Sequence, residues 1–338
     1  MNLTSQRPRL IDLHPAPADI SALVRAGMER RPRQLPAWLL YDAEGSRLFE
    51  AICEQPEYSL TRTEVQLLED SAAAIATAIG PPAPVVLEFG AGNDRKAGPL
   101  LEALRPPAYL ALDISRSALE ATCASIQAGH PATRVLGVCC DYNDMPELPA
   151  LPELAGRRRL GFYPGSSIGN FDPAEACSLL VQFRRLLGPD GLLLIGIDQP
   201  KAVRRLEAAY DDAAGASAAF ALNLLARLNR DLAGDFDPAG FRYRARWQPE
   251  HSRIAMALVS ERPQAVRLAG GRWSFAAGEE LITEYSVKYT PEAFLQLAAA
   301  AHWQPLGRWS DAAGDVSLHL LGQGRRLGQA AAAQADSV

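Results

Sequence analysis

Two glycines follow a short apolar stretch in the first half of the chain, in the segment Pro84-Val-Val-Leu-Glu-Phe-Gly-Ala-Gly92. Glycine lets a backbone turn tightly and approach a ligand closely. The carboxyl end of a buried strand is also the usual cofactor site of an open α/β sheet. Gly90 and Gly92 are therefore the first candidates for binding a cofactor.

Two aspartates stand at the ends of the next two apolar stretches. Asp113 comes about 20 residues after the glycine turn, where an acid commonly holds ribose hydroxyls. Asp141 ends the following stretch and could accept a hydrogen bond from an adenine amino group. A dinucleotide fingerprint needs a third glycine at position 95, which is occupied by Arg95. The pattern therefore counts against NAD and favours a methyltransferase-type loop, which has no pyrophosphate to hold.

Two further polar segments have readings that the residues alone leave open. In Gly165-Ser-Ser-Ile-Gly-Asn170-Phe171, Asn170 offers both a donor and an acceptor to a substrate, or else caps a helix that starts at Pro173. In Thr283-Glu-Tyr-Ser286, Glu284 and Ser286 project to the same face of a strand. They either bind a ligand that carries N–H groups or belong to a solvent-exposed strand with alternating polar residues.

Aromatic residues gather near the N-terminus, and another lies in the second half of the chain. They include Trp38, Tyr41, Phe49 and Tyr58, followed later by Tyr210. Such residues most often fill cores or interfaces. Around a sulfonium or a methylated amine they would also attract the positive charge through their ring faces.

Alternating strands and helices predict the fold that must position these residues. The pattern indicates a doubly wound α/β sheet, because strands that alternate with helices pair in parallel through right-handed crossovers. Ser115 is expected to cap the second helix of this run. The expected strands cover residues 84–90, 109–113, 134–141, 160–163 and 192–198, and the helices cover 94–104, 115–128 and 173–187.

The alternation stops near Pro200, where an inserted α+β subdomain is expected. It should contain one or two helices in 201–235, strands at 241–247, 254–259 and 280–289, and a hairpin around Gly270-Gly271. A helix at 291–301 and a last strand at 316–321 then return to the sheet. We expect the first 60 residues to stay out of the sheet and to join the insert as a lid. The predicted domains are thus 61–199 plus 287–324 for the cofactor, 1–60 plus 200–286 for the substrate, and a disordered tail at 325–338.

Composition excludes several classes of protein. The chain has 338 residues, 48% of them hydrophobic and 22% charged, which is typical of folded globular proteins. Its net charge of −5 lacks the basic excess of a protein that binds nucleic acid through phosphates. The longest apolar runs are too short to cross a bilayer, so neither nucleic acid nor membrane is an expected partner.

The cysteines and histidines form no ligand pattern. There are five of each, and no two cysteines make a Cys-x-x-Cys pair, so we predict neither a metal site nor a disulfide framework. The polar N-terminus lacks the apolar core of a secretion signal. We therefore expect a monomer in the reducing cytoplasm that acts on a small molecule.

Taken in order along the chain, these motifs resemble the SAM-dependent L-histidine Nα-methyltransferase family of ergothioneine biosynthesis. The resemblance spans about residues 36 to 322 and implies a Rossmann-like class I methyltransferase sheet. It rests on Tyr41-Asp-Ala-Glu-Gly-Ser-Arg-Leu-Phe49, Pro56-Glu-Tyr58, Thr61-Arg-Thr-Glu64, Glu88-Phe-Gly-Ala-Gly92 with Lys96, Gly165-Ser-Ser-Ile-Gly-Asn-Phe171, Ala209-Tyr-Asp-Asp212, Leu222-Asn-Leu-Leu-Ala-Arg-Leu-Asn229 and Thr283-Glu-Tyr-Ser-Val-Lys-Tyr289.

The resemblance implies a role for each matching residue. Tyr41 and Tyr58 would lie near the reacting nitrogen as the catalytic residues. The substrate's amino and carboxylate groups would be held by Tyr58, Gly165, Asn170 and Tyr210, and its imidazole by Met256, Glu284 and Ser286. The SAM-contacting residues would be Gly90, Lys96, Asp113, Asp141 and Tyr142. The family transfers three methyl groups to the α-amine of histidine, which gives hercynine.

Other functions stay open at this point. The acceptor could be a histidine derivative or another amino acid, since Ser59 replaces an aromatic residue that the family often has after Tyr58. A non-catalytic SAM-binding protein is a second alternative, although Asn170, Tyr210 and Glu284 argue against it. A nicotinamide-dependent oxidoreductase is a third.

Overall fold

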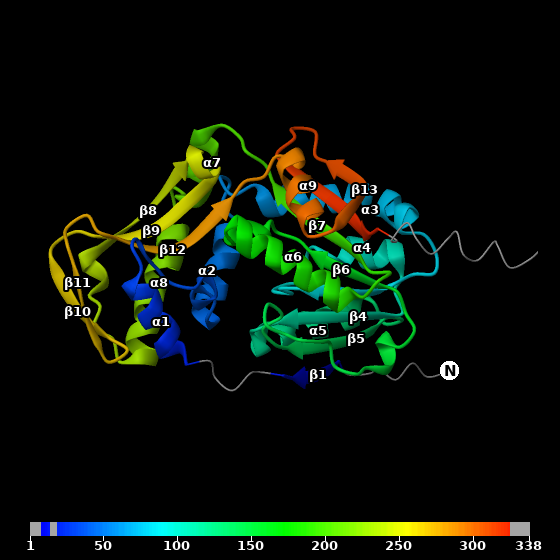
Figure 1. Cartoon of the computed structure of the whole chain (residues 1–338), viewed down its shortest axis with the longest axis horizontal. Helices are drawn as coiled ribbons and strands as arrows, with labels where there is room; N and C mark the ends of the chain where they lie inside the picture. The colour runs from blue at the N-terminus through cyan, green and yellow to red at the C-terminus, as the bar shows by residue number, and fades with distance from the viewer. Residues whose placement is uncertain (1–7, 14–18, 325–338) are drawn as a thin grey trace, which may run out of the picture.

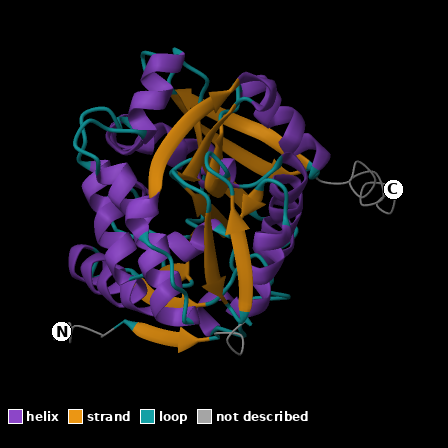
Figure 2. Cartoon of the chain, turned by 90° about the vertical axis from the view of Figure 1, so that its left-hand side faces the viewer, coloured by secondary structure: helices purple, strands orange, loops and turns teal. Residues whose placement is uncertain are grey.

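The structure is a computed structural model that describes residues 8–13 and 19–324. A large sheet lies on the right in Figure 1, and a smaller sheet with a hairpin lies on the left. Figure 2 shows helices flanking the strands on both sides. The predicted tail at 325–338 lies outside the described residues.

Within the described residues, the large sheet has eight strands. They are β1 (Arg9–Asp12), β3 (Val85–Phe89), β4 (Ala108–Asp113), β5 (Arg134–Cys139), β6 (Arg159–Tyr163), β7 (Leu192–Asp198), β13 (Trp303–Ser310) and β14 (Val316–Gln323). Their order is β1-β5-β4-β3-β6-β7-β14-β13. β14 pairs antiparallel with both of its neighbours, and the other neighbouring strands are parallel. The predicted doubly wound sheet is confirmed.

This order creates a crevice where the ligand site is expected. The chain runs outward from β3 through β4 to β5 and then returns to place β6 and β7 on the other side of β3. At such a reversal the connections leave in opposite directions, which opens a crevice at the carboxyl ends of the strands. The glycine turn at Gly90 and the loop at Gly165 both leave the sheet at this point.

Successive residues of the central strands supply two hydrophobic cores, one on each face of the sheet. Val86 belongs to the core that includes α3 (Leu60–Ile79), α4 (Ala97–Leu104) and α5 (Arg116–Gly129). Its neighbours Val85 and Leu87 belong to the core with α6 (Pro173–Leu187) and α9 (Pro291–Ala300). Ser115 caps α5 as predicted, by accepting the backbone N–H of Ala118. Among the described helices, none is long and apolar enough to cross a membrane.

The inserted part follows β7 and contains α7 (Val203–Tyr210), α8 (Ala216–Leu232), β8 (Phe241–Gln248), β9 (Arg253–Ser260) and β12 (Glu280–Val287). The predicted hairpin is formed by β10 (Gln264–Leu268) and β11 (Gly271–Phe275). The smaller sheet has the order β2-β12-β9-β8, in which β2 (Arg33–Gln34) comes from the N-terminal segment. The same segment supplies α1 (Ile20–Glu29) and α2 (Ala43–Cys53), and α2 packs on α8.

One expectation about the large sheet was wrong, and one of its strands was missed. The N-terminal segment does not stay outside it, because Arg9–Asp12 pairs in parallel with β5. Gly137 of β5 makes room for Leu10, whose Cδ2 would lie 2.4 Å from a Cβ at that glycine. β13 was missed because its sequence contains Pro305 and Gly307 and because most of its residues are exposed at the sheet edge.

A short 3-10 turn joins the two sheets beside the crevice. This turn, η3 (Ser167–Asn170), lies against β12. A Cβ at Gly169 would lie 2.6 Å from the carbonyl oxygen of Val287. Glycine is therefore needed here for the close approach of two backbones.

We predict that Gly169→Ala lowers the unfolding free energy by about 1–3 kcal/mol, because the added methyl group must push η3 away from β12. Chemical denaturation measures this change. Gly98→Ala is the matched control, since a Cβ at Gly98 in α4 meets no atom within 4 Å. Unfolding at the same denaturant concentration in both variants would show that this contact does not hold the sheets together.

Candidate active site

A wide cleft and a small pocket meet at the crevice. The cleft has a volume of about 950 Å³ and lies over the ends of β3, β4, β5 and β6. All six residues predicted to hold the cofactor line it: Gly90, Gly92, Lys96, Asp113, Asp141 and Tyr142. All eight residues predicted to act on the substrate line the small pocket: Tyr41, Tyr58, Gly165, Asn170, Tyr210, Met256, Glu284 and Ser286.

The chemistry of the cleft fits a nucleoside that carries an amino acid. Gly90 has a φ of +76°, and a Cβ at Gly92 would enter open space, so the glycine turn leaves room for a ligand. Asp113 and Asp141 each accept a backbone N–H with Oδ1, from Ser115 and Asn143 respectively. Their second oxygens supply acceptors for hydroxyl and amino groups. Lys96 adds a cation at the junction with the pocket.

Glu64 was missed by the sequence analysis, although its segment is part of the family motif. It is fully buried and accepts the backbone N–H of Gly165 with both oxygens, at 2.9 and 2.8 Å. It also pairs with Lys96, at 2.8 Å between Oε2 and Nζ. Since Glu64 lies one turn before Leu67 and Leu68 on the apolar face of α3, helical periodicity could have revealed its burial. The Glu64 carboxylate thus positions both Lys96, which lines the cleft, and Gly165, which lines the small pocket.

Asn170 and Glu284 line the small pocket and are bonded to each other. Asn170 Nδ2 donates to Glu284 Oε1 at 2.8 Å, which links η3 to β12. Asn170 is not the helix cap, because Asp172 caps α6 in a capping box with Glu175. Glu284 is only 8% exposed, so the reading of β12 as a solvent-facing strand is wrong. A register shift between Ile282 and Glu284 marks a bulge, a device that re-aims side chains beside active sites.

Tyr210 and Ser286 are hydrogen-bonded to each other in the lining of the pocket, with 2.9 Å between their hydroxyl oxygens. Tyr210 is held at the end of α7, where its carbonyl accepts the Tyr243 hydroxyl at 2.7 Å. Asp212 of the same motif accepts two backbone N–H groups at the start of α8. Met256 of β9 stands opposite Glu284 in the strand register.

Aromatic side chains form part of the lining of the small pocket. Tyr41 makes edge contacts with Phe49 and Phe220, and Tyr58 makes them with Phe49 and Tyr210. Burial raises the pKa of both Tyr41 and Tyr58 well above the ordinary value. At neutral pH they are therefore phenols, which can accept an N–H bond but do not act as phenolate bases.

Burial also raises the pKa of Glu284 to about 8, despite the opposing charge of Lys288. A carboxyl group with this pKa lies in the range where acid–base roles are possible. In the part of the chain that the structure describes, no three His, Cys, Asp or Glu side chains gather in a way that could hold a metal.

The strand order, the glycine turn and the two strand-end carboxylates define a class I SAM-dependent methyltransferase. The chain belongs to the family described as histidine-specific, SAM-dependent methyltransferases, whose profile matches residues 20–323. It is 39% identical over 303 residues to a histidine N-alpha-methyltransferase from Mycolicibacterium smegmatis, covering 88% of this chain and 92% of that protein.

Two further likenesses are more distant. The chain is 31% identical to ergothioneine biosynthesis protein 1 from Neurospora crassa, over 87% of this chain and 34% of that protein. Its structure is similar to that of the CcbJ methyltransferase from Streptomyces caelestis, with a TM-score of 0.45 and 15% identity, over 75% of this chain and 89% of that one.

We predict that Glu284→Gln stabilises the empty protein at pH 8.5 but not at pH 4.5. The folded protein holds a proton on Glu284 up to about pH 8, whereas the unfolded chain loses it near its ordinary pKa of 4.5. Stability from this group is therefore lost as the pH rises between those values. The difference in unfolding free energy should reach on the order of 4 kcal/mol at pH 8.5.

Denaturant titrations of both proteins at the two pH values measure this difference. Glu250→Gln is the control, because Glu250 is exposed on the same lobe. A difference for Glu284→Gln that does not change with pH would contradict the buried environment assigned to this carboxyl group.

Proposed function

We propose that this methyltransferase transfers methyl groups from SAM to the α-amine of L-histidine, three times, and so forms hercynine for ergothioneine biosynthesis. The observation that carries the proposal is the placement of Glu284 and Ser286 on one strand face of a pocket that opens toward the SAM cleft. The names of the two relatives, which refer to histidine Nα-methylation and to ergothioneine, support the same substrate and pathway.

SAM supplies an already activated methyl group, so the protein mainly contributes position and electrostatics. In this proposal Gly90, Gly92 and Tyr142 contact SAM. Asp113 and Asp141 accept from its hydroxyl and amino groups, while Lys96 attracts its carboxylate.

The pocket offers polar partners for the imidazole, the carboxylate and the α-amine of histidine. Glu284 would accept an imidazole N–H, and Ser286 would bond the other ring nitrogen, with Met256 packing against the ring. Asn170 uses one amide hydrogen on Glu284 and has a second for the substrate carboxylate. A residue without a polar ring would offer no partner to the Glu284 oxygen that Asn170 does not use, which is a strong ground for rejecting it.

The α-amine must lose its proton before it attacks a methyl group. Tyr41 and Tyr58 remain phenols at neutral pH because burial raises the pKa of both. We propose that their oxygens accept the amine's N–H bonds and orient its lone pair, while water carries the proton away. Each methyl group removes one N–H donor, and the aromatic wall then stabilises the growing cation.

We also propose the domain boundaries, the cellular location and the oligomeric state of the enzyme. The cofactor domain would comprise 61–199 plus 287–324, with β1 added to its sheet, and most of 20–60 plus 200–286 would form the substrate domain. Cys53, Cys123, Cys140 and Cys177 are free thiols, which supports a reducing cytoplasm. One chain supplies every group that the proposal needs, which supports a monomer that works without a metal.

Incubation with histidine and SAM tests this function directly. Mass spectrometry should detect mono-, di- and trimethylated histidine, with the trimethylated product accumulating. A panel that includes histidine derivatives and other amino acids tests the acceptor. If histidine stays unmethylated while another amino acid in the panel is converted, the histidine assignment is wrong.

We predict that Glu284→Ala lowers kcat/KM for histidine by about 100-fold or more, because Asn170 and the imidazole N–H both lose their acceptor. Initial rates from product quantification measure the loss. Glu250→Ala on the same lobe should retain the original rate. Unchanged turnover in Glu284→Ala would remove this residue from substrate recognition.

A further inference from the structure

The small pocket lacks a positive charge that could face a carboxylate. Among the described residues that line it, Glu284 is the one acidic side chain, and there is no Lys, Arg or His. An amino acid brings a carboxylate as well as an amine, and burying an uncompensated anion is costly. Any cation that compensates this carboxylate therefore lies outside the residues that line the pocket.

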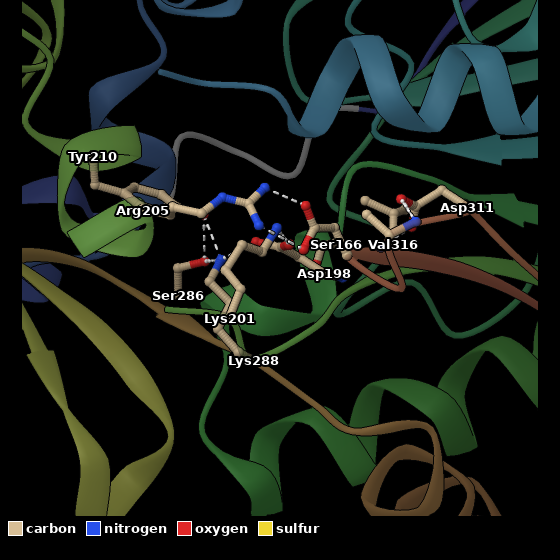
Figure 3. A network of polar contacts seen from close by, with 11 residues as sticks. Ser166, Asp198, Lys201, Arg205, Tyr210, Ser286, Lys288, Asp311 and Val316 are labelled. Atoms are coloured by element: carbon tan, nitrogen blue, oxygen red, sulfur yellow. Dashed lines mark hydrogen bonds and ion pairs between the residues drawn. The ribbon is translucent and has the colours of Figure 1, made fainter. Parts of the chain in front are cut away.

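Lys288 contacts Tyr210 and Ser286, two of the residues that line the pocket (Figure 3), and its own side chain is fully buried. Its ammonium group donates to the Tyr210 hydroxyl at 2.5 Å and to Ser286 Oγ at 2.8 Å. It also pairs with Asp198 Oδ2 at 2.6 Å. These three contacts use all three N–H donors of the lysine, so none is left to reach a ligand directly.

A count of the hydroxyl hydrogens shows how Lys288 affects the donor capacity of Tyr210 and Ser286. Tyr210 and Ser286 have one hydroxyl hydrogen each, and the bond between their oxygens uses one of the two. Both oxygens already accept from Lys288. The pair thus retains one O–H, and a donor whose oxygen accepts from an ammonium group is a stronger donor.

Asp198, which does not line the small pocket, stabilises the positive charge of Lys288. Burial opposes this charge, but Asp198 and Tyr210 raise the pKa of Lys288 above its ordinary value. Asp198 also pairs with Lys201, whose Nζ lies 2.7 Å from Oδ1. Two ammonium groups therefore share one buried carboxylate, and Lys288 alone of the two contacts the pocket hydroxyls in the described structure.

We propose that Lys288 is a positioning residue for the substrate carboxylate, which it attracts through the polarised hydroxyl of Tyr210, while the Ser286 hydroxyl donates to Tyr210 and its oxygen faces the imidazole. This inference rests on the proposed function, since it takes an amino acid as the ligand of the small pocket. It extends that function by assigning selectivity for a free carboxylate to a residue that the ligand does not touch.

Binding of two ligands that differ at the carboxylate tests the proposal. Calorimetry in the presence of adenosylhomocysteine compares histidine with histidinamide in the full-length enzyme and its variants. In Lys288→Met the affinity for histidine should fall by about 10- to 100-fold, as expected for the loss of a charge-assisted hydrogen bond. The affinity for histidinamide should change by less than about threefold, because it brings no anion.

Lys201→Met is the matched control, because it removes one ammonium group from the same carboxylate without contacting either hydroxyl. It should keep the original preference for histidine over histidinamide. Asp198→Asn combined with Lys288→Met removes both charges of the pair together, so the variant contains no buried carboxylate that has lost Lys288. This double variant should also lose the preference.

Three results would overturn the proposal. One is a preference for histidine that survives in Lys288→Met or in the double variant. Another is an equal loss for both ligands, which would indicate a structural role. The third is the same loss of preference in Lys201→Met. Failure of the proposed function looks different, because the binding preference for histidine would persist while no methylated product forms.

Discussion

The buried carboxylate of Asp198, which pairs with both Lys288 and Lys201, is the centre of the contact between the two sheets. Asp198 ends β7 of the large sheet, and Lys288 directly follows β12 of the smaller one. A charge buried without any partner is strongly destabilising, so this network favours keeping the two strand ends together. Since the pocket hydroxyls contact the same lysine, the joint between the sheets is also a wall of the active site.

Two more polar contacts, made by Glu64 and by Asn170, connect the segments that surround the active site. Glu64 ties the Gly165 loop to Lys96 and so couples the cofactor cleft to the pocket. Asn170 ties η3 to Glu284. Buried hydrogen-bonded networks hold side chains in one orientation, which a transfer between two bound molecules requires. The cleft and the pocket consequently share the residues that these contacts hold, among them Gly165, Asn170 and Glu284.

Much of the fold could be predicted because its signals are local. Short apolar strands alternating with helices indicate a doubly wound sheet, and motif residues such as Gly90 and Asn170 do lie together around the two cavities. The edge strand β1 and the exposed β13 lack apolar periodicity, so only tertiary pairing reveals them. Glu64, Asp198 and Lys288 were missed as members of the site for a different reason. In a sequence a charged residue resembles a surface residue until its distant partner is known.

We infer that one amino acid binds between the two sheets with its amine directed at the cofactor. A crystal structure with adenosylhomocysteine and histidine bound is the decisive measurement. We expect the imidazole between Glu284 and Ser286, the carboxylate at Asn170 and Tyr210, and the α-nitrogen facing the sulfur. A histidine bound with its ring toward the sulfur, or outside this pocket, would contradict it.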